Sequence, residues 1–169
     1  GANALGSNYV STADGIYAAH GDHCLWLDPT TGETKGEFRL PASPGAAGQR
    51  SPQWSHLKVW DDLLLVCAEP VSFTGEAAAT WNGAGSKRLA ALDRRTGRVL
   101  WAKEAQYCFR HNAVTVGGGK VFAIDRAPDE WMKELNAKGG KPAASLAPWR
   151  LYAFDLWTEG RWYTDLCLA

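Results

Sequence analysis

The feature that most constrains the fold of this chain is an internal repeat built around an aspartate. In a chain of 169 residues, three apolar runs end in an Asp that leads into a turn, at Asp28, Asp93 and Asp155. These residues lie 65 and 62 positions apart. A second strand-like run follows each turn, over residues 34–40, 98–105 and 161–168. Self-similarity of this kind is typical of repeat architectures, so it predicts the fold class before any single motif does.

The turns carry the side chains that close a hairpin. Asp accepts hydrogen bonds from backbone N–H groups two or three residues further on, and Thr does the same with its hydroxyl. Gly supplies the positive φ of a tight connection. Thr31 and Gly32 follow Asp28, and Thr96 and Gly97 follow the second Asp at the same spacing. Each repeat is therefore expected to contain a hairpin with an Asp-x-x-Thr-Gly connection.

A further hairpin precedes each of these turns. Its strands are expected at residues 8–12 and 15–20, at 56–60 and 63–68, and at 113–116 and 120–126. Four antiparallel strands in meander order form the blade of a β-propeller. The predicted fold class is all-β, a propeller fragment of about three blades at roughly residues 6–40, 54–105 and 110–169. Propellers contain about four to eight blades, so we expect further blades in a parent chain.

The residues beyond a compact blade gather in three connections, at 41–53, 70–87 and 127–150. In a meander these connections all leave from one face of the disc, and the tight turns leave from the other. Long loops confined to one face usually mark the binding face. The third connection also contains the one short helix that the sequence predicts, near residues 129–138.

The second repeat reads Ala-Leu-Asp-Arg-Arg-Thr-Gly-Arg-Val-Leu-Trp from Ala91 to Trp101. This segment resembles the tryptophan-docking motif of the pyrroloquinoline quinone (PQQ) repeat family. The first repeat has Phe38 in place of the Trp. The third departs further, with Glu159 where Gly is expected and Trp162 as the candidate Trp. The resemblance implies a large propeller in which this Trp packs against a neighbouring blade.

The resemblance implies two functional branches. One contains periplasmic alcohol and sugar dehydrogenases that use PQQ and Ca²⁺, and the other contains propellers without an enzymatic activity, including the lipoprotein subunit of the outer-membrane β-barrel assembly machinery. The docking motif is structural and does not separate them. The chain lacks the adjacent Cys–Cys pair that many quinoprotein alcohol dehydrogenases carry.

We therefore expect a binding or scaffold module with no complete active site in this segment, and assign it no cofactor or metal. The alternatives are part of a PQQ- and Ca²⁺-dependent dehydrogenase, whose parent protein would hold both groups, and a WD-type protein-interaction propeller. The family resemblance suggests a periplasmic or extracytoplasmic location.

Polar residues stand where the chain enters each innermost strand. They are expected to rim the mouth of the propeller channel and to offer hydrogen-bond donors to an anionic or carbonyl-rich ligand such as a quinone. The alternative is that they line a water-filled channel. Trp81, in the second long connection, is the Trp expected to bind. The other candidates are Asn8, His56, Arg110, His111 and Asn112.

Charge and hydropathy narrow the class of partner. The chain has 18 Lys and Arg and 18 Asp and Glu, so it shows no electrostatic footprint for nucleic acid. No apolar run approaches the roughly 20 residues that span a bilayer. The expected partners are the remaining blades of the parent chain and a protein or small molecule on the long-loop face. His20, Asp22 and His23 are interpreted as exposed polar residues, and the scattered cysteines as buried apolar side chains.

Overall fold

The structure is a computed structural model that describes residues 8–42, 51–71, 85–126, 149–158 and 161–166, the last segment by its backbone. Its elements form three units of four strands each. Unit 1 contains β1 (Tyr9–Thr12), β2 (Gly15–His20), β3 (His23–Leu27) and β4 (Thr34–Arg39). Unit 2 contains β5 (Trp54–Trp60), β6 (Leu63–Pro70), β7 (Gly85–Asp93) and β8 (Val99–Arg110). Unit 3 contains the 3-10 turn η3 (His111–Ala113), β9 (Thr115–Gly117), β10 (Lys120–Asp125), β11 (Trp149–Asp155) and β12 (Arg161–Leu166).

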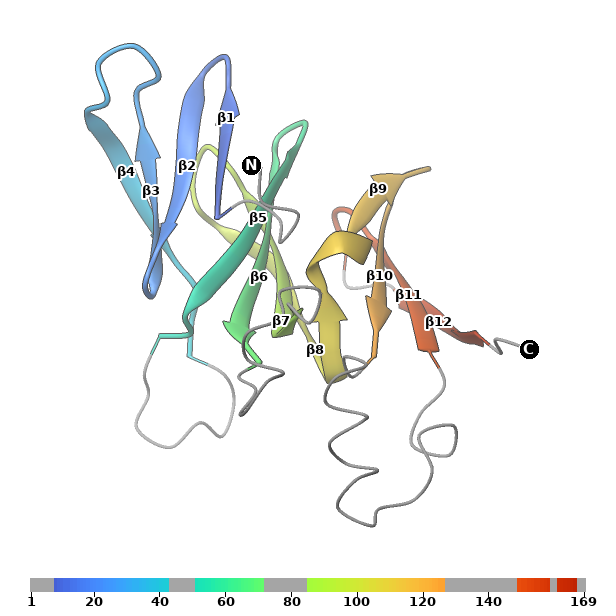
Figure 1. The fold of residues 1–169 in the computed structure, drawn as a ribbon. Helices are drawn as coiled ribbons and strands as arrows, with labels where there is room; N and C mark the ends of the chain where they lie inside the picture. Colours follow the sequence, from blue (N-terminus) through green and yellow to red (C-terminus); the bar gives the residue numbers. More distant parts are fainter. Residues whose placement is uncertain (1–7, 43–50, 72–84, 127–148, 159–160, 167–169) are drawn as a thin grey trace.

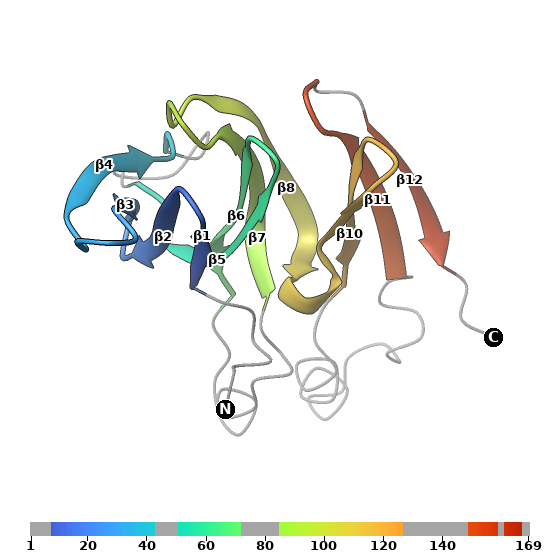
Figure 2. The ribbon, with the colours of Figure 1, turned by 90° about the horizontal axis from the view of Figure 1, so that it is seen from above.

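Every strand pairing within the units is antiparallel and joins strands that are consecutive in the chain. The three meanders stand side by side in chain order (Figures 1 and 2). This arrangement confirms the all-β fold class. The helix expected near residues 129–138 lies outside the described residues.

Unit 2 differs from expectation in its last strand. β8 runs to Arg110, five residues beyond the predicted end at residue 105, and its Phe109 pairs with Asp125 of β10. Units 2 and 3 therefore share one sheet, whereas unit 1 forms a sheet of its own. The physical reason is long-range, because the extension is held by a carboxylate from the next unit, described below.

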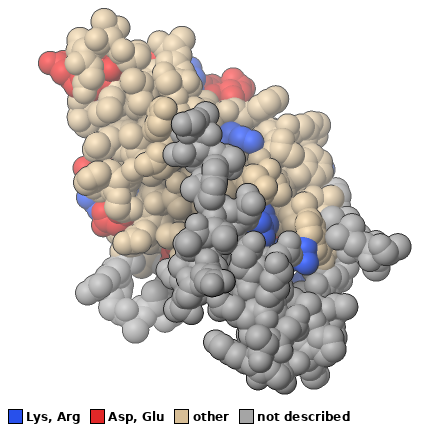
Figure 3. Space-filling model, viewed as in Figure 1, with Lys and Arg blue, Asp and Glu red and all other residues tan. Residues whose placement is uncertain are grey.

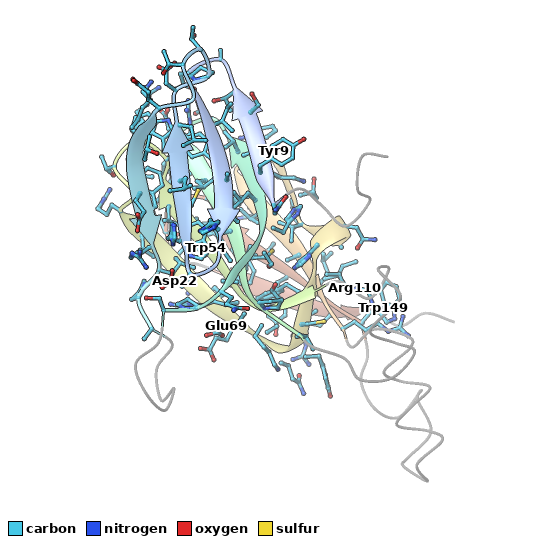
Figure 4. The ribbon with its side chains drawn as sticks, turned by 60° about the vertical axis from the view of Figure 1, so that its left-hand side comes forward. Tyr9, Asp22, Trp54, Glu69, Arg110 and Trp149 are labelled. Atoms are coloured by element: carbon cyan, nitrogen blue, oxygen red, sulfur yellow. The ribbon has the colours of Figure 1, made fainter. Side chains whose placement is uncertain are left out.

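The described ends of the long connections lie at one end of the strands. The backbone N–H of Glu69 donates to the carbonyl of Gln53 at 2.7 Å, which joins the ends of the first two connections. The guanidinium of Arg88 donates to the carbonyl of Pro41 at 2.6 Å. Figure 4 shows Trp54 and Glu69 at this same end of the strands. The β1–β2, β3–β4 and β5–β6 turns lie at the opposite end (Figure 1). The tight β2–β3 turn lies at the end of the long connections, where the carbonyl of Gly21 accepts a hydrogen bond from the N–H of Trp54 at 2.8 Å.

The core lies between the units, in two layers on either side of unit 2. The run 63–68 in β6 is buried throughout because both faces of this strand are covered. Leu64 and Val66 face unit 1 and pack in one cluster with Tyr17. Leu63 and Leu65 belong to the other cluster, which includes residues of unit 3. A strand covered on both faces has a continuous apolar sequence instead of an alternating one.

Candidate functional site

The first two Asp turns have nearly the same geometry. Asp28 Oδ1 accepts hydrogen bonds from the N–H groups two and three residues further on, at 2.8 and 3.0 Å. Asp93 Oδ1 accepts the equivalent pair at 3.0 and 2.9 Å. These N–H groups hold the pKa of both carboxyls below its usual value. Gly32 and Gly97 close the two turns with φ of 75° and 73°.

The third turn is built differently. Asp155 accepts a hydrogen bond from the ammonium of Lys120 on β10 at 2.6 Å, and this bond is the main cause of its lowered pKa. Glu159 lies outside the described residues. The Asp of the third repeat thus ties the turn to the neighbouring strand.

Aromatic side chains join each unit to the turn of the next. Trp101 is 2% exposed, and its Nε1–H donates to the carbonyl of Leu156 at 3.0 Å. Phe38 of unit 1 lies on the turn of unit 2, since a Cβ added at Gly97 would sit 2.4 Å from its Cδ1. At Gly32, the equivalent glycine of unit 1, no described atom lies within 4 Å of the same position. Each junction therefore places a ring on the turn of the following unit.

The structure divides the candidates for the channel mouth. Asn8 and Asn112 are exposed and Arg110 is half-buried, whereas His56 and His111 are each only 7% exposed. Trp81 lies outside the described residues. The two imidazoles therefore form part of a packed junction, and the residues that remain open to a ligand are the two asparagines and the arginine.

The two buried imidazoles stack on each other between units 2 and 3, with ring centroids 5.3 Å apart. His111 Nε2 lies 2.8 Å from the Oγ of Ser86, which in turn lies 2.7 Å from the Oγ of Ser55. Within the described residues, both ring nitrogens of His56 are buried without a hydrogen-bond partner. Burial, and then the charge of Lys58, lowers the pKa of His56 to about 4. The two serines carry no local sequence signal, so sequence reasoning did not find this cluster.

A pocket of about 180 Å³ opens beside this cluster, on unit 3. Its wall contains two guanidinium groups and an indole ring, and the guanidinium of Arg126 lies 4.2 Å from the ring centroid of Trp149. Figure 4 shows Arg110 next to Trp149, and Figure 3 shows separate Lys and Arg side chains along the border of the grey residues. Such a wall suits an anionic group. The described lining residues are Arg110, Asn112, Ala113, Ile124, Arg126 and Trp149.

Sequence reasoning selected two of the six described lining residues of this pocket. It singled out Arg110 and Asn112 because they precede an innermost strand. It did not select Arg126 or Trp149 as site residues. The available signal was weak, because these two residues flank the third long connection at opposite ends.

Asp125 holds the backbone next to the pocket in place. Its carboxylate is buried and accepts hydrogen bonds from three successive backbone N–H groups of β8, at 2.6, 2.9 and 3.0 Å. These groups belong to residues 106–108, so the carboxylate fixes the chain immediately before Arg110. These hydrogen bonds give Asp125 a structural role.

A second polar link joins units 1 and 2 at the tight-turn end. The guanidinium of Arg94 donates to Asp14 at 2.7 Å, to the hydroxyl of Tyr17 at 3.2 Å and to the carbonyl of Asp61 at 2.6 Å. The residue that follows the Asp differs from repeat to repeat, so the repeat pattern did not predict this role of Arg94.

The resemblance stated above implies PQQ and Ca²⁺, and the donor chemistry tests whether this segment fits them. Ca²⁺ takes about six to eight oxygen ligands, largely carboxylates and carbonyls. In the described ranges, no three His, Cys, Asp or Glu side chains form a cluster that could hold a metal ion. The oxygens of the buried Asp125 are already taken by backbone N–H groups. The described residues therefore do not fit the ion, and no chemical step is assigned to it.

The remaining polar groups flagged in the sequence have structural explanations. Asp22 accepts a hydrogen bond from Arg39 at 2.8 Å and lies 3.0 Å from Nδ1 of His23, which makes an ion-paired surface hairpin. The described cysteines, Cys24, Cys67 and Cys108, are free and buried. Burial raises their pKa to about 12, 12 and 11, so they carry little thiolate at neutral pH.

The chain is similar to known proteins in structure, whereas the comparisons of sequence found no match. No protein-family model and no curated protein sequence matches the chain. Among solved structures, BamB from Moraxella catarrhalis matches at 15% identity with a TM-score of 0.53, over 93% of this chain and 37% of BamB. A europium-containing methanol dehydrogenase matches at 14% identity and a TM-score of 0.53, over 93% of this chain and 24% of the enzyme. A computationally designed protein, Ika4, matches at 12% identity with a TM-score of 0.54, over 94% of this chain and 70% of the designed chain.

The chain thus spans well under half the length of the two natural proteins that it resembles. In the part of the chain that the structure describes, no helix has the length and apolar character of a membrane span. At these identities the likeness shows the fold alone. That fold is a β-propeller segment, similar to parts of BamB, of the europium-containing methanol dehydrogenase and of a quinohemoprotein alcohol dehydrogenase from Pseudomonas putida.

Proposed function

We propose that this chain is a segment of a PQQ-repeat-type β-propeller and works as a binding and scaffold module, without a complete active site of its own. One observation carries the proposal. The two unit-to-unit junctions follow one plan, in which Phe38 covers the turn at Gly97 and Trp101 covers the turn at Leu156. A plan that repeats along the chain extends naturally to further blades.

The first turn supports the same extension. Gly32 has the backbone conformation of Gly97, but no described atom lies within 4 Å of where its Cβ would be. The matching position in unit 2 is covered by a ring. Unit 1 therefore offers a docking place for an aromatic residue of a preceding blade, and the remaining blades of the parent protein are its first partners.

The binding role belongs to the end of the strands from which the long connections leave. Exposed Asn8 and Asn112 and half-buried Arg110 lie there as hydrogen-bond donors. The structural likeness to BamB favours a protein partner on this face. The likeness to BamB and to PQQ-type dehydrogenases also favours an extracytoplasmic location.

The second candidate function is a part of a PQQ-dependent dehydrogenase, favoured by the likeness to the europium-containing methanol dehydrogenase. In that case the quinone and its metal are held by other residues of the parent protein. A WD-type interaction propeller is less favoured, because the Asp-x-x-Thr-Gly turn is typical of PQQ repeats.

Alanine at the two matched glycines tests the blade proposal. Both positions have a positive φ, which costs about 1–2 kcal/mol for a residue with a Cβ. Gly97→Ala additionally forces the Cβ against the ring of Phe38, so in this chain it should lower the free energy of unfolding more than Gly32→Ala. In the longer natural protein that contains the chain, a docked ring should make Gly32→Ala as costly as Gly97→Ala.

Gly118→Ala serves as the control, since Gly118 also has a positive φ and open space around it. If Gly32→Ala matches this control in the longer protein, no blade covers the first turn and the proposal fails. The activity is tested separately with the present chain, PQQ, Ca²⁺, an alcohol and a dye that accepts electrons. We expect no dye reduction above the protein-free blank, and turnover would favour the dehydrogenase.

A further inference from the structure

The pocket on unit 3 corresponds to a position on unit 2 that a side chain occupies. The strand registers establish this equivalence, because β6 starts opposite Asp93 and β10 starts opposite Asp155, the matching residues of the repeat. Counting from these pairs, Ile124 of β10 stands where Cys67 stands in β6. Cys67 pairs with His56, and the residue of unit 3 that corresponds to His56 is Ala113.

On unit 2 this place is occupied by a side chain of the following unit. The ring of His111 stacks on His56 and lies within hydrogen-bond distance of Ser86. The walls at this position are the neutral imidazole of His56 and serine hydroxyl groups, so they suit the imidazole ring of His111. On unit 3 the corresponding walls belong to the pocket, and no described side chain fills it.

The chemistry of the walls changes between the two units. Ser55 of unit 2 corresponds to Asn112 of unit 3, and Glu69 corresponds to Arg126. Arg110, at the end of β8, also lines the pocket. None of the described lining residues is acidic. Asp125 follows Ile124 on the strand and so points to the opposite face, where its oxygens bind backbone N–H groups. The described part of the wall therefore contains two guanidinium groups and no carboxylate.

The arrangement of the groups favours a planar anion with an apolar body. Guanidinium groups donate parallel hydrogen bonds that match the two oxygens of a carboxylate. The plane of Arg126 is held over the ring of Trp149, at 4.2 Å from the centroid. Ile124 and Ala113 add apolar wall. A volume of about 180 Å³ accommodates a small ring but lies below the roughly 300–1,000 Å³ of sites for larger ligands.

We propose that this pocket binds a carboxylate group, with Arg110 and Arg126 as its donors and Trp149 as the surface beside them. The inference rests on the proposed function, since it names the chemistry bound at the long-loop end of unit 3. The carboxylate comes either from a free small acid or from an Asp or Glu side chain of an adjoining blade. These two sources share the same recognition, and the experiment separates them.

The test is a titration of the whole chain with benzoate, followed by the NMR signal of the Trp149 indole N–H, which the variant Trp149→Phe assigns. Benzyl alcohol, which has the ring without the carboxylate, is the matched ligand control. We expect saturable shifts with benzoate alone. Arg110→Gln and Arg126→Gln should each weaken binding about tenfold, the equivalent of one charge-assisted hydrogen bond.

Arg95→Gln is the matched protein control, because Arg95 is an exposed arginine at the tight-turn end, hydrogen-bonded to Asp62. It should leave the affinity for benzoate unchanged. Asn112→Asp places a negative charge at an exposed position of the pocket and should abolish binding without disturbing the core. This variant keeps the test informative if either arginine variant folds poorly.

The longer natural protein distinguishes the two sources. Benzoate binding to both the chain and the longer protein assigns the pocket to a free acid, and binding to the chain alone assigns it to a carboxylate of an adjoining blade. The proposal is overturned if benzoate fails to bind the chain, if benzyl alcohol binds as well, or if the arginine variants bind like the parent. None of these results bears on the glycine comparison, so failure of the pocket and failure of the propeller proposal remain separate.

Discussion

The two junctions between units are joined by different chemistry. Between units 1 and 2 the docking ring is Phe38, which has no polar atom, and the polar link is the ion pair of Arg94 with Asp14 at the tight-turn end. Between units 2 and 3 the docking ring of Trp101 donates a hydrogen bond, and the carboxylate of Asp125 binds three backbone N–H groups. The second junction alone continues one sheet into the next unit.

This difference matters because the polar links differ in burial. The side chain of Asp14 is 43% exposed, so water replaces its hydrogen bonds when the pair opens. Asp125 is 1% exposed and Trp101 is 2% exposed, so their partners would lose hydrogen bonds without gaining water. The junction between units 2 and 3 should therefore resist separation more strongly, although both junctions use the same repeat motif.

The largest expected effect is at Trp101. Trp101→Ala removes a buried indole and should lower the free energy of unfolding by about 3–5 kcal/mol. Trp101→Phe keeps most of the apolar contact and loses the hydrogen bond to Leu156, so it should cost about 1 kcal/mol beyond any repacking. Urea denaturation of the two variants measures both values. Equal stability of Trp101→Ala and the parent chain would show that this ring does not hold the junction.

A somewhat smaller effect is expected from the buried carboxylate. Asp125→Ala leaves the N–H groups of residues 106–108 without their acceptor and should cost about 3 kcal/mol. Arg94→Ala, at the more exposed link, should cost about 1–2 kcal/mol. Hydrogen exchange at residues 106–108 provides the local measurement, and it should accelerate in Asp125→Ala but not in Arg94→Ala. The reverse order of the two losses would contradict the comparison.

The last expected effect is a dependence of stability on pH at the second junction, which is small near neutral pH and grows as the pH falls. The pKa of His56 is lowered to about 4 in the folded chain, against about 6.5 when unfolded. Between these values the unfolded chain binds more protons, so stability is complete above pH 6.5 and falls as the pH drops toward 4. The loss amounts to no more than about 3 kcal/mol.

The variant His56→Leu tests the assignment of this pH dependence. It removes the titrating group but keeps an apolar side chain against His111, so the stability should become flatter between pH 6.5 and 4. Asp28 and Asp93 affect stability in a separate pH range, because the pKa of each carboxyl is lowered below its ordinary value near 3.8. An unchanged slope in His56→Leu would assign the pH dependence to other groups.

Local chemistry made the strands and turns predictable. The Asp-x-x-Thr-Gly connection contains its own hydrogen-bond partners, so the turns at Asp28 and Asp93 follow from a few neighbouring residues. The same holds for Trp101, since its place in the repeat fixes its face of the strand. Arg110 and Asn112 were found because they precede an innermost strand of the repeat.

Long-range contacts made the rest unpredictable. The extension of β8 depends on Asp125, which is 17 to 19 positions further along the chain. The partners of His111, Ser55 and Ser86, come from unit 2, at sequence separations of 56 and 25. Burial of the two imidazoles follows from this meeting of units, and no pattern near either residue signals it.

The sequence by itself determined the repeat, the four-stranded meander and the docking of a ring on the next turn, because these depend on hydrogen bonds and side-chain periodicity within a single repeat. Only the tertiary structure decided which polar residues became buried and which formed the pocket on unit 3. Arg110, Asn112 and Trp149 of that pocket lie on three different elements, and Arg126 directly follows a fourth, β10. Their neighbourhood is set by how the long β8 crosses to η3 and β10, and a carboxylate buried between two units fixes that crossing.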